Sequence, residues 1–189
     1  PIKINQRTVI KASMFIDGVQ KGKTSKKTIF FSKAIGKNVK YNSQYSDRYT
    51  GSGPLTLVDG LTGSIAHNDN YWQGWHENDM DVTIDLSKVE RLSRISMGFL
   101  ESHGSWIFLP TQVIVSFSDD GSYYKKQIEI QIADGKRGGA ANRVECESKN
   151  LNVSARYVRV KAINRKKCPE WHPGSGGKTW VFSDEIIVE

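Results

Sequence analysis

The chain has 189 residues, a formal net charge of +7 and two cysteines. This length provides for one domain with a hydrophobic core of its own, and two cysteines exclude a disulfide-stapled scaffold. Residues 1–40 contain ten Lys and Arg residues and one acidic residue, whereas residues 41–189 contain 17 basic and 19 acidic residues. Because the basic residues concentrate in the N-terminal arm, the composition argues against a domain that binds nucleic acid.

Two alternating segments near the N-terminus, residues 7–15 and 27–33, are predicted to form a strand pair joined across residues 17–25. A strand pair of this size cannot bury a core by itself. We therefore expect residues 1–33 to be a linker or the tail of a preceding small β-domain, and residues 34–189 to form the main domain.

Short runs that alternate apolar and polar side chains recur through the main domain, which indicates half-buried strands. They are residues 81–86, 92–99, 112–118, 125–132, 155–162 and 179–188. The pair Asp120 and Gly121 favours a tight hairpin turn between the third and the fourth of these runs. Because no helical pattern alternates with the strands, the sequence predicts an all-β fold, an antiparallel β-sandwich of the jelly-roll kind.

The segment 41–64 has little strand pattern but many Gly, Ser and Asp residues, and a loop of this length needs something to hold it in place. Calcium can do so, because it accepts carboxylate, hydroxyl and carbonyl oxygens in an irregular cage. Asp59 and Ser64 flank the turn "DGLTGS" and could contribute such oxygens, although the EF-hand spacing is absent. From these residues alone, an ordinary Asp-Gly turn with a capping Asp is the favoured explanation.

A family resemblance covers about residues 34–189 and lies in five segments, which follow one another in a characteristic order and spacing. They read "LVDGLTGS", "VTIDLSKVERLSRISMGFL", "LPTQVIVSFSDDGSYY", "ARYVRVKAIN" and "WVFSDEIIV". Together they resemble the coagulation factor 5/8 type C (discoidin-like) domain, a family that includes the family 32 carbohydrate-binding modules. The loop "GSWIFLP" and the ending "CPEWHPGSGGKTWVFSDEI" are most similar to the C-terminal module of bacterial putative chitobiases and β-hexosaminidases of glycoside hydrolase family 20.

The resemblance implies an eight-stranded, galactose-binding-domain-like jelly roll with a structural calcium ion. Side-chain oxygens would come from Asp59, Ser64 and Glu185, and main-chain carbonyls from Thr56, Leu61 and Asp184. With the resemblance included, calcium becomes the favoured explanation for the 41–64 loop. The alternative is that Asp184 and Glu185 are solvent-facing residues on an edge strand.

Sugar binding requires flat apolar faces together with a few polar groups that orient hydroxyls. Four of the five tryptophans lie in polar, glycine-bearing segments, whereas Trp180 alternates with Phe182 and is predicted to join the core. We expect Trp106 or Trp171 to be the stacking platform. The further candidates for a carbohydrate-binding site are Trp72, Asn70, His103, His172 and Lys178. For each loop tryptophan, the alternative is that its ring closes the end of the core.

Catalysis within this chain is disfavoured, because no HExxH or GxSxG motif is present. Neighbouring acids on a strand also point to opposite faces and cannot flank one glycosidic bond together. The resemblance implies a non-catalytic carbohydrate-binding module of a secreted, periplasmic or surface-attached bacterial glycosidase, with an N-acetylhexosamine- or galactose-type glycan as its partner. Two alternatives are a module that packs on the catalytic domain of the parent enzyme and, ranked lower, a phospholipid-binding domain. The latter would use Ile107 and Phe108 beside Arg165, Lys166 and Lys167.

Overall fold

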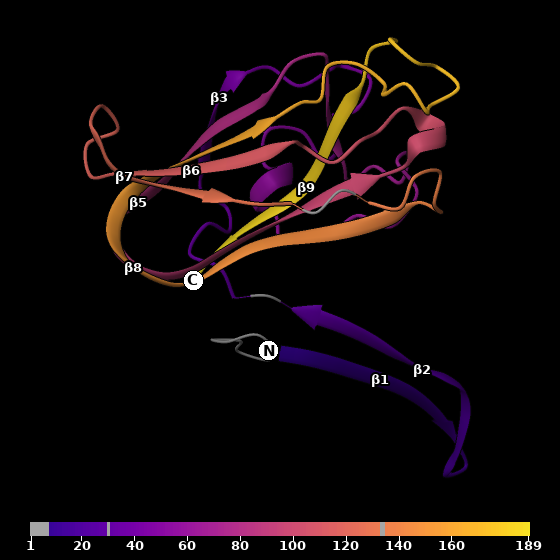
Figure 1. The fold of residues 1–189 in the computed structure, drawn as a ribbon. Helices are drawn as coiled ribbons and strands as arrows, with labels where there is room; N and C mark the ends of the chain where they lie inside the picture. Colours follow the sequence, from indigo (N-terminus) through magenta and orange to yellow (C-terminus); the bar gives the residue numbers. More distant parts are fainter. Residues whose placement is uncertain (1–7, 30, 133–134) are drawn as a thin grey trace.

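The computed structural model describes residues 8–29, 31–132 and 135–189, the side chains of residues 27 and 28 excepted. In this part of the chain, β1 and β2 form a separate two-stranded sheet, and seven strands form the main antiparallel sheet, which folds over into a sandwich (Figure 1). The strands are β1 (Thr8–Ile16), β2 (Val19–Ile29), β3 (Asn38–Ser43), β4 (Gln73–His76), β5 (Met80–Glu101), β6 (Gln112–Ser118), β7 (Tyr124–Ile130), β8 (Asn142–Ile163) and β9 (Trp180–Val188). Two 3-10 turns, η1 (Thr56–Val58) and η2 (His103–Ser105), complete the elements. The predicted all-β antiparallel fold is confirmed.

Strands β5 and β8 each run through both layers of the sandwich. They pair from Met80 and Ala162 to Glu101 and Asn142, with an irregular register between residues 85 and 90 of β5. The first half of β5 also pairs with β3, whereas its second half pairs with β9. The predicted separate strands 81–86 and 92–99 are therefore one bent strand. Because two strands belong to both layers, the sandwich has seven strands in the described residues, whereas the resemblance implied eight.

The core lies between the two layers and is built from the inward-facing positions of the alternating strands. Val113, Val115 and Phe117 of β6 are fully buried, as the period-two pattern of residues 112–118 predicts. Cys146 and Cys168 are both buried and not bonded to each other. The described part of the chain contains no helix with the length and apolarity that crossing a membrane requires.

The N-terminal hairpin projects away from the sandwich (Figure 1). Its two strands meet at a tight turn, because Asp17 and Gly18 both have positive φ (47° and 76°), and β2 begins at Val19. The predicted long connection across residues 17–25 was therefore wrong. Beyond the hairpin, the Lys33 amide donates to the Val188 carbonyl at 2.7 Å, which joins the start of the main domain to β9. The boundary between residues 33 and 34 stays a prediction.

The hairpin predicted around Asp120 is present between β6 and β7, but its loop has five residues rather than a two-residue turn. Ser118 pairs with Tyr124, and the Asp120 carboxylate accepts the amides of Ser122 and Tyr123 at 2.8 and 2.9 Å. Gly121 adopts φ +80°, a conformation that favours glycine. Strands β3 and β4, which the sequence pattern missed, are short and lie where polar residues dominate.

Candidate functional site

Two loops meet at one end of the sandwich, and both are anchored by backbone pairing. The first follows β5 and contains η2, and the second joins β8 to β9 (Figure 1). The Trp180 amide donates to the Trp106 carbonyl at 3.0 Å, and the Phe108 amide donates to the Trp180 carbonyl at 3.0 Å. These bonds place the "GSWIFLP" loop directly against the start of β9.

Trp106 and Trp171 are the two tryptophans with substantial exposure at this end, at 39% and 36%. Trp106 adopts a left-handed backbone conformation with φ 62°. Its ring lies against Gly174 and Gly177, where an added Cβ would come within 2.4 Å of ring carbons. The glycines of "HPGSGGK" therefore leave the space in which the Trp106 ring rests.

Substituting Gly177→Ala is expected to displace the Trp106 ring and to destabilise the fold by about 1–3 kcal/mol, because the new methyl group overlaps the ring. Urea unfolding, followed together with quenching of tryptophan fluorescence, measures both effects. Gly104→Ala is the matched control, since a Cβ at Gly104 meets no atom within 4 Å. Equal effects of the two substitutions would contradict this account of the glycines.

His103, Phe108 and His172 join the two tryptophans in one aromatic cluster. The rings of His103 and Trp171 meet edge to face at 5.0 Å, and those of Trp106 and His172 at 5.9 Å. Nδ1 of His172 accepts the Gly174 amide at 3.0 Å, so the proton lies on Nε2, which donates to the His103 carbonyl at 2.8 Å. Both nitrogens of the buried His172 are thus occupied, which corrects its predicted role as a hydroxyl partner.

Glu101 and His103 form a polar pair in the wall of the site. Nδ1 of His103 accepts the Gly138 amide at 3.2 Å, so its proton lies on Nε2, 3.0 Å from Oε1 of Glu101. Both ring nitrogens of His103 therefore contact protein groups, and the ring orients the Glu101 carboxylate. Within the described residues, Oε2 of Glu101 has no hydrogen-bond partner, and Gly135 leaves room for the carboxylate, since a Cβ there would lie 1.9 Å from it. Glu101 therefore offers the hydroxyl partner that was predicted at His103.

Two hollows lie beside these residues, and Trp171 and His103 line both of them. The polar hollow has a volume of about 440 Å³ and contains the charged side chains of the site. The indole hollow has a volume of about 300 Å³ and lies between Trp106 and Trp171. The charged side chains lining the polar hollow are Glu101, Arg137, Arg165 and Glu170.

The other predicted sugar-binding residues line neither of these two hollows. Trp72 is buried in the core, and its indole N–H donates to the Ser64 carbonyl at 3.1 Å, so its prediction as a sugar-binding ring was wrong. Asn70 lines a separate hollow of about 100 Å³. Lys178 forms an ion pair with Glu77 at 2.7 Å.

Pattern reasoning missed three charged residues of the polar hollow, Glu101, Arg137 and Glu170, and considered Phe108 and Arg165 only for the phospholipid alternative. Arg137 stands in the glycine-rich segment "GKRGGAAN", and such segments are typical of binding loops, which is the signal that could have drawn attention to it. Ile107 and Phe108 are buried rather than projecting, which removes the apolar spike on which the phospholipid alternative depended.

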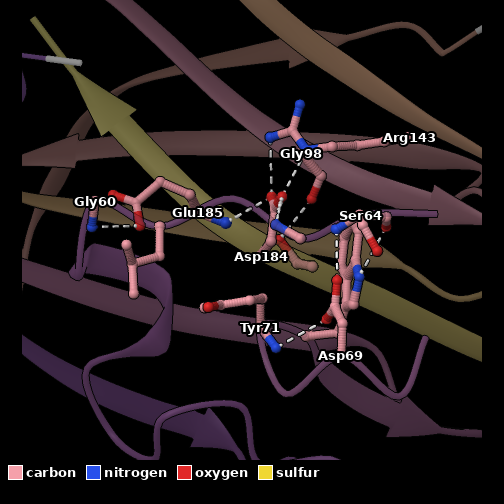
Figure 2. Close-up of polar contacts among 12 residues, drawn as sticks. Gly60, Ser64, Asp69, Tyr71, Gly98, Arg143, Asp184 and Glu185 are labelled. Atoms are coloured by element: carbon pink, nitrogen blue, oxygen red, sulfur yellow. Dashed lines mark hydrogen bonds and ion pairs between the residues drawn. The ribbon is translucent and has the colours of Figure 1, made fainter. Parts of the chain in front are cut away.

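A second group of polar residues lies where β9 meets the 41–64 loop (Figure 2). Glu185 is buried, and its Oε2 accepts the Gly60 amide at 3.0 Å. Its Oε1 is buried and has no hydrogen-bond partner among the described residues. Burial raises the pKa of Glu185 to about 9, and the nearby carboxylates of Asp59 and Asp184 contribute to the increase. A buried carboxylate oxygen without a partner is the kind of group that a cation would satisfy.

The neighbouring Asp184 side chain is fully engaged with protein partners. Arg143 donates to it through Nε at 2.5 Å and through the second guanidinium nitrogen at 3.1 Å, and the Gly63 amide donates at 2.9 Å (Figure 2). A Cβ on Gly98 would lie 2.1 Å from the carboxylate, so glycine leaves room for this pair. Asp184 and Glu185 are buried on a strand between β4 and β5, which excludes the alternative of solvent-facing residues on an edge strand.

The other residues predicted to bind calcium lie in the 41–64 loop, beside Glu185. Asp59 accepts the Leu61 amide at 2.8 Å and the Ser52 hydroxyl at 2.5 Å. The Ser64 hydroxyl accepts a hydrogen bond from the Ala66 amide at 3.1 Å. The Thr56 hydroxyl donates to loop carbonyls, so the group of Thr56 that would bind the ion is its main-chain carbonyl, as predicted. No group of three or more His, Cys, Asp or Glu side chains suited to a metal occurs among the described residues. The expected donor set has only two carboxylates, and its other oxygens are hydroxyl and carbonyl groups, which suits calcium rather than zinc.

Comparison with known proteins identifies a matching family and similar solved structures. The F5/8 type C domain family matches residues 17–181. A fucose binding module of Streptococcus pneumoniae, SpX-3, superposes with a TM-score of 0.52 at 16% identity, over 85% of this chain and 98% of that module. The lectin domain of lectinolysin, solved with Lewis B antigen, gives a TM-score of 0.51 at 15% identity, over 84% and 96%. No curated protein matches the sequence. The expected galactose-binding-domain-like fold is thereby confirmed.

Proposed function

Because this chain belongs to the F5/8 type C domain family, we propose that it is a non-catalytic carbohydrate-binding module for N-acetylhexosamine- or galactose-containing glycans. The observation that carries this proposal is the half-exposed ring of Trp171, which lines the same hollow as Glu101, a buried residue with a carboxylate oxygen that has no hydrogen-bond partner among the described residues. An aromatic face next to hydrogen-bonding groups is the combination by which proteins hold a pyranose.

The solved relatives support the same assignment, since one is described as a fucose binding module and the other was solved with Lewis B antigen. In this chain, the ring of Trp171 would cover the apolar face of a sugar. Oε2 of Glu101 would accept a hydrogen bond from a hydroxyl, and Arg137 would donate to ring or hydroxyl oxygens. Each of these groups acts in binding, and none is asked to break a bond.

We further propose that the parent protein is a secreted or surface-attached glycoside hydrolase of the chitobiase or β-hexosaminidase type. The support is the ending "CPEWHPGSGGKTWVFSDEI" and the loop "GSWIFLP", which resemble the C-terminal modules of such enzymes. The module would hold the catalytic domain near glycan chains and so raise the local substrate concentration.

Calcium is proposed as the structural ion of the module. The buried, unpartnered Oε1 of Glu185 and the adjacent Asp59 support it, and Ser64 together with the carbonyls of Thr56, Leu61 and Asp184 would complete the oxygen set. Bound there, calcium would supply positive charge to buried carboxylates and would tie the 41–64 loop to β9.

The sugar-binding role is tested with Trp171→Ala. We expect the unaltered chain to bind a glycan from a calcium-containing array with a Kd of roughly 10 μM to 1 mM, the range of a shallow site for one or two sugars. Trp171→Ala is expected to weaken this binding at least about tenfold by titration calorimetry, because stacking area is lost. Tyr123→Ala is the matched control, since Tyr123 is an exposed aromatic residue in the β6–β7 turn. The absence of any glycan bound by the unaltered chain would overturn the proposal.

A further inference from the structure

We propose that the site takes two neighbouring sugar residues, one on each side of Trp171, and that the indole hollow receives an N-acetyl group on the second residue. This inference rests on the proposed function and adds to it the length and the chemical class of the ligand. It follows from the different chemistry of the two hollows and from the ring that lines both of them.

Trp171 lines both hollows, and its ring packs against two neighbouring rings. Its ring meets His103 edge to face at 5.0 Å and lies 6.2 Å from the ring of Phe108. Because His103 and Trp171 line both hollows, the two spaces adjoin each other at these side chains. One pyranose cannot occupy both sides of an indole. A ligand that fills both must contain two residues joined by a linkage that passes the exposed part of Trp171.

The polar hollow suits a neutral terminal sugar. Its described charged side chains are two carboxylates, Glu101 and Glu170, and two guanidinium groups, Arg137 and Arg165, so neither sign dominates. Glu101 lines this hollow, and its Oε2, which has no hydrogen-bond partner within the described residues, can accept a hydrogen bond from a hydroxyl. Acceptors and donors side by side match hydroxyl groups, which both donate and accept.

The indole hollow has the opposite character. None of the described residues that line it carries a charged side chain. The ring nitrogens of His172 and Nδ1 of His103 are hydrogen-bonded to protein groups, and Nε2 of His103 lies 3.0 Å from Oε1 of Glu101. Its apolar surface comes from Trp106, Trp171 and Pro173. A carboxylate, sulfate or ammonium group placed there would lose its water without gaining a partner. The methyl group of an acetamide, by contrast, gains from burial between two indole rings.

Together the hollows select a neutral oligosaccharide whose second residue is N-acetylated. The volume of about 300 Å³ lies at the lower end of small-molecule sites and accommodates one sugar residue with its acetamido group. Trp106 lines this hollow and is 39% exposed, which disfavours the alternative that its ring only closes the end of the core.

The test compares matched glycans and matched variants by titration calorimetry in calcium. Galactose, lactose and N-acetyllactosamine share a terminal galactose, and the last two differ only in the acetamido group of the second residue. N-acetylglucosamine and its β1,4-linked dimer, diacetylchitobiose, form the second series. Trp106→Ala removes the indole hollow, and Tyr123→Ala removes an exposed aromatic ring in the β6–β7 turn.

In the series whose monosaccharide binds, we expect the N-acetylated disaccharide to bind about tenfold more tightly than the monosaccharide. Trp106→Ala should reduce the ratio of disaccharide to monosaccharide affinity from about ten to about one, and far-ultraviolet circular dichroism serves as the folding control. Tyr123→Ala should alter neither affinity. Equal affinity for monosaccharide and disaccharide, or a gain that Trp106→Ala leaves intact, would overturn the two-residue site alone. Failure of every sugar in both series with the unaltered chain would instead count against the proposed function.

Discussion

Replacing Arg143 by methionine is expected to destabilise the fold by about 3–5 kcal/mol. The guanidinium group of Arg143 makes two hydrogen bonds to Asp184, which is fully buried, and the substitution leaves that carboxylate with only backbone amides. An uncompensated buried charge carries most of the cost, while the methionine side chain preserves much of the packing. Chemical denaturation with a far-ultraviolet circular dichroism readout measures the change.

The matched control is Arg156→Met. Arg156 makes the same two-point contact with Asp85, at 2.7 and 2.8 Å, but both side chains of that pair are substantially exposed. The control should shift the unfolding midpoint only slightly, because exposed pairs are screened by water and salt. The double variant Arg143→Met with Asp184→Asn should recover part of the loss, since it removes the stranded charge. Similar losses for the buried and the exposed pair would contradict the importance given to burial.

The second large effect expected is a fall in stability with rising pH in the calcium-free protein. Burial raises the pKa of Glu185 from its ordinary value of 4.5 to about 9, so the folded chain keeps a proton that the unfolded chain releases. The stability that this group contributes is complete below about pH 4.5 and is lost as the pH rises toward 9. The slope approaches about 1.4 kcal/mol per pH unit, which amounts to several kcal/mol over the window.

Comparing the unaltered chain with Glu185→Gln isolates this effect, because glutamine does not titrate. Unfolding free energies measured in chelator from pH 5 to pH 9 should fall more steeply for the unaltered chain than for the variant. Added calcium should restore stability to the unaltered chain above neutral pH, since it can bind the ionised carboxylate, and should help the variant much less. Parallel pH curves in chelator would refute the raised pKa, whereas a lack of response to calcium would count against the ion alone.

Local patterns predicted the strands that have one buried and one exposed face. Residues 112–118 became β6 with unchanged bounds, because alternation reports directly which side chains face the core. The continuity of β5 could not be predicted in this way. Four of the five residues 87–91 carry polar side chains, which are typical of a turn. The chain nevertheless passes through them as a bend between the layers, and long-range pairing with β8 decides that outcome.

The candidate site was only partly predictable, because burial of a loop ring depends on contacts from distant segments. Trp72 and Trp106 stand in similar polar, glycine-bearing stretches. The first is enclosed in the core over Gly63, whereas the second rests on Gly174 and Gly177 and stays half open. The pairing of Glu101 with His103 likewise depends on the turn of η2 after β5, which residue types alone do not reveal.

The placement of β9 has a consequence for how the chain acquires its structure. β9 comes after every other strand in sequence, yet it lies between β4 and β5 in the sheet. During synthesis, β4 therefore lacks its pairing partner, and one flank of β5 stays open to water until the segment from Trp180 to Val188 has left the ribosome. Folding governed by such distant pairings is slow, and the open flank exposes apolar surface and unpaired backbone groups to other chains. Aggregation of nascent or truncated chains is thus a hazard that this topology creates and that the arrival of its final strand removes.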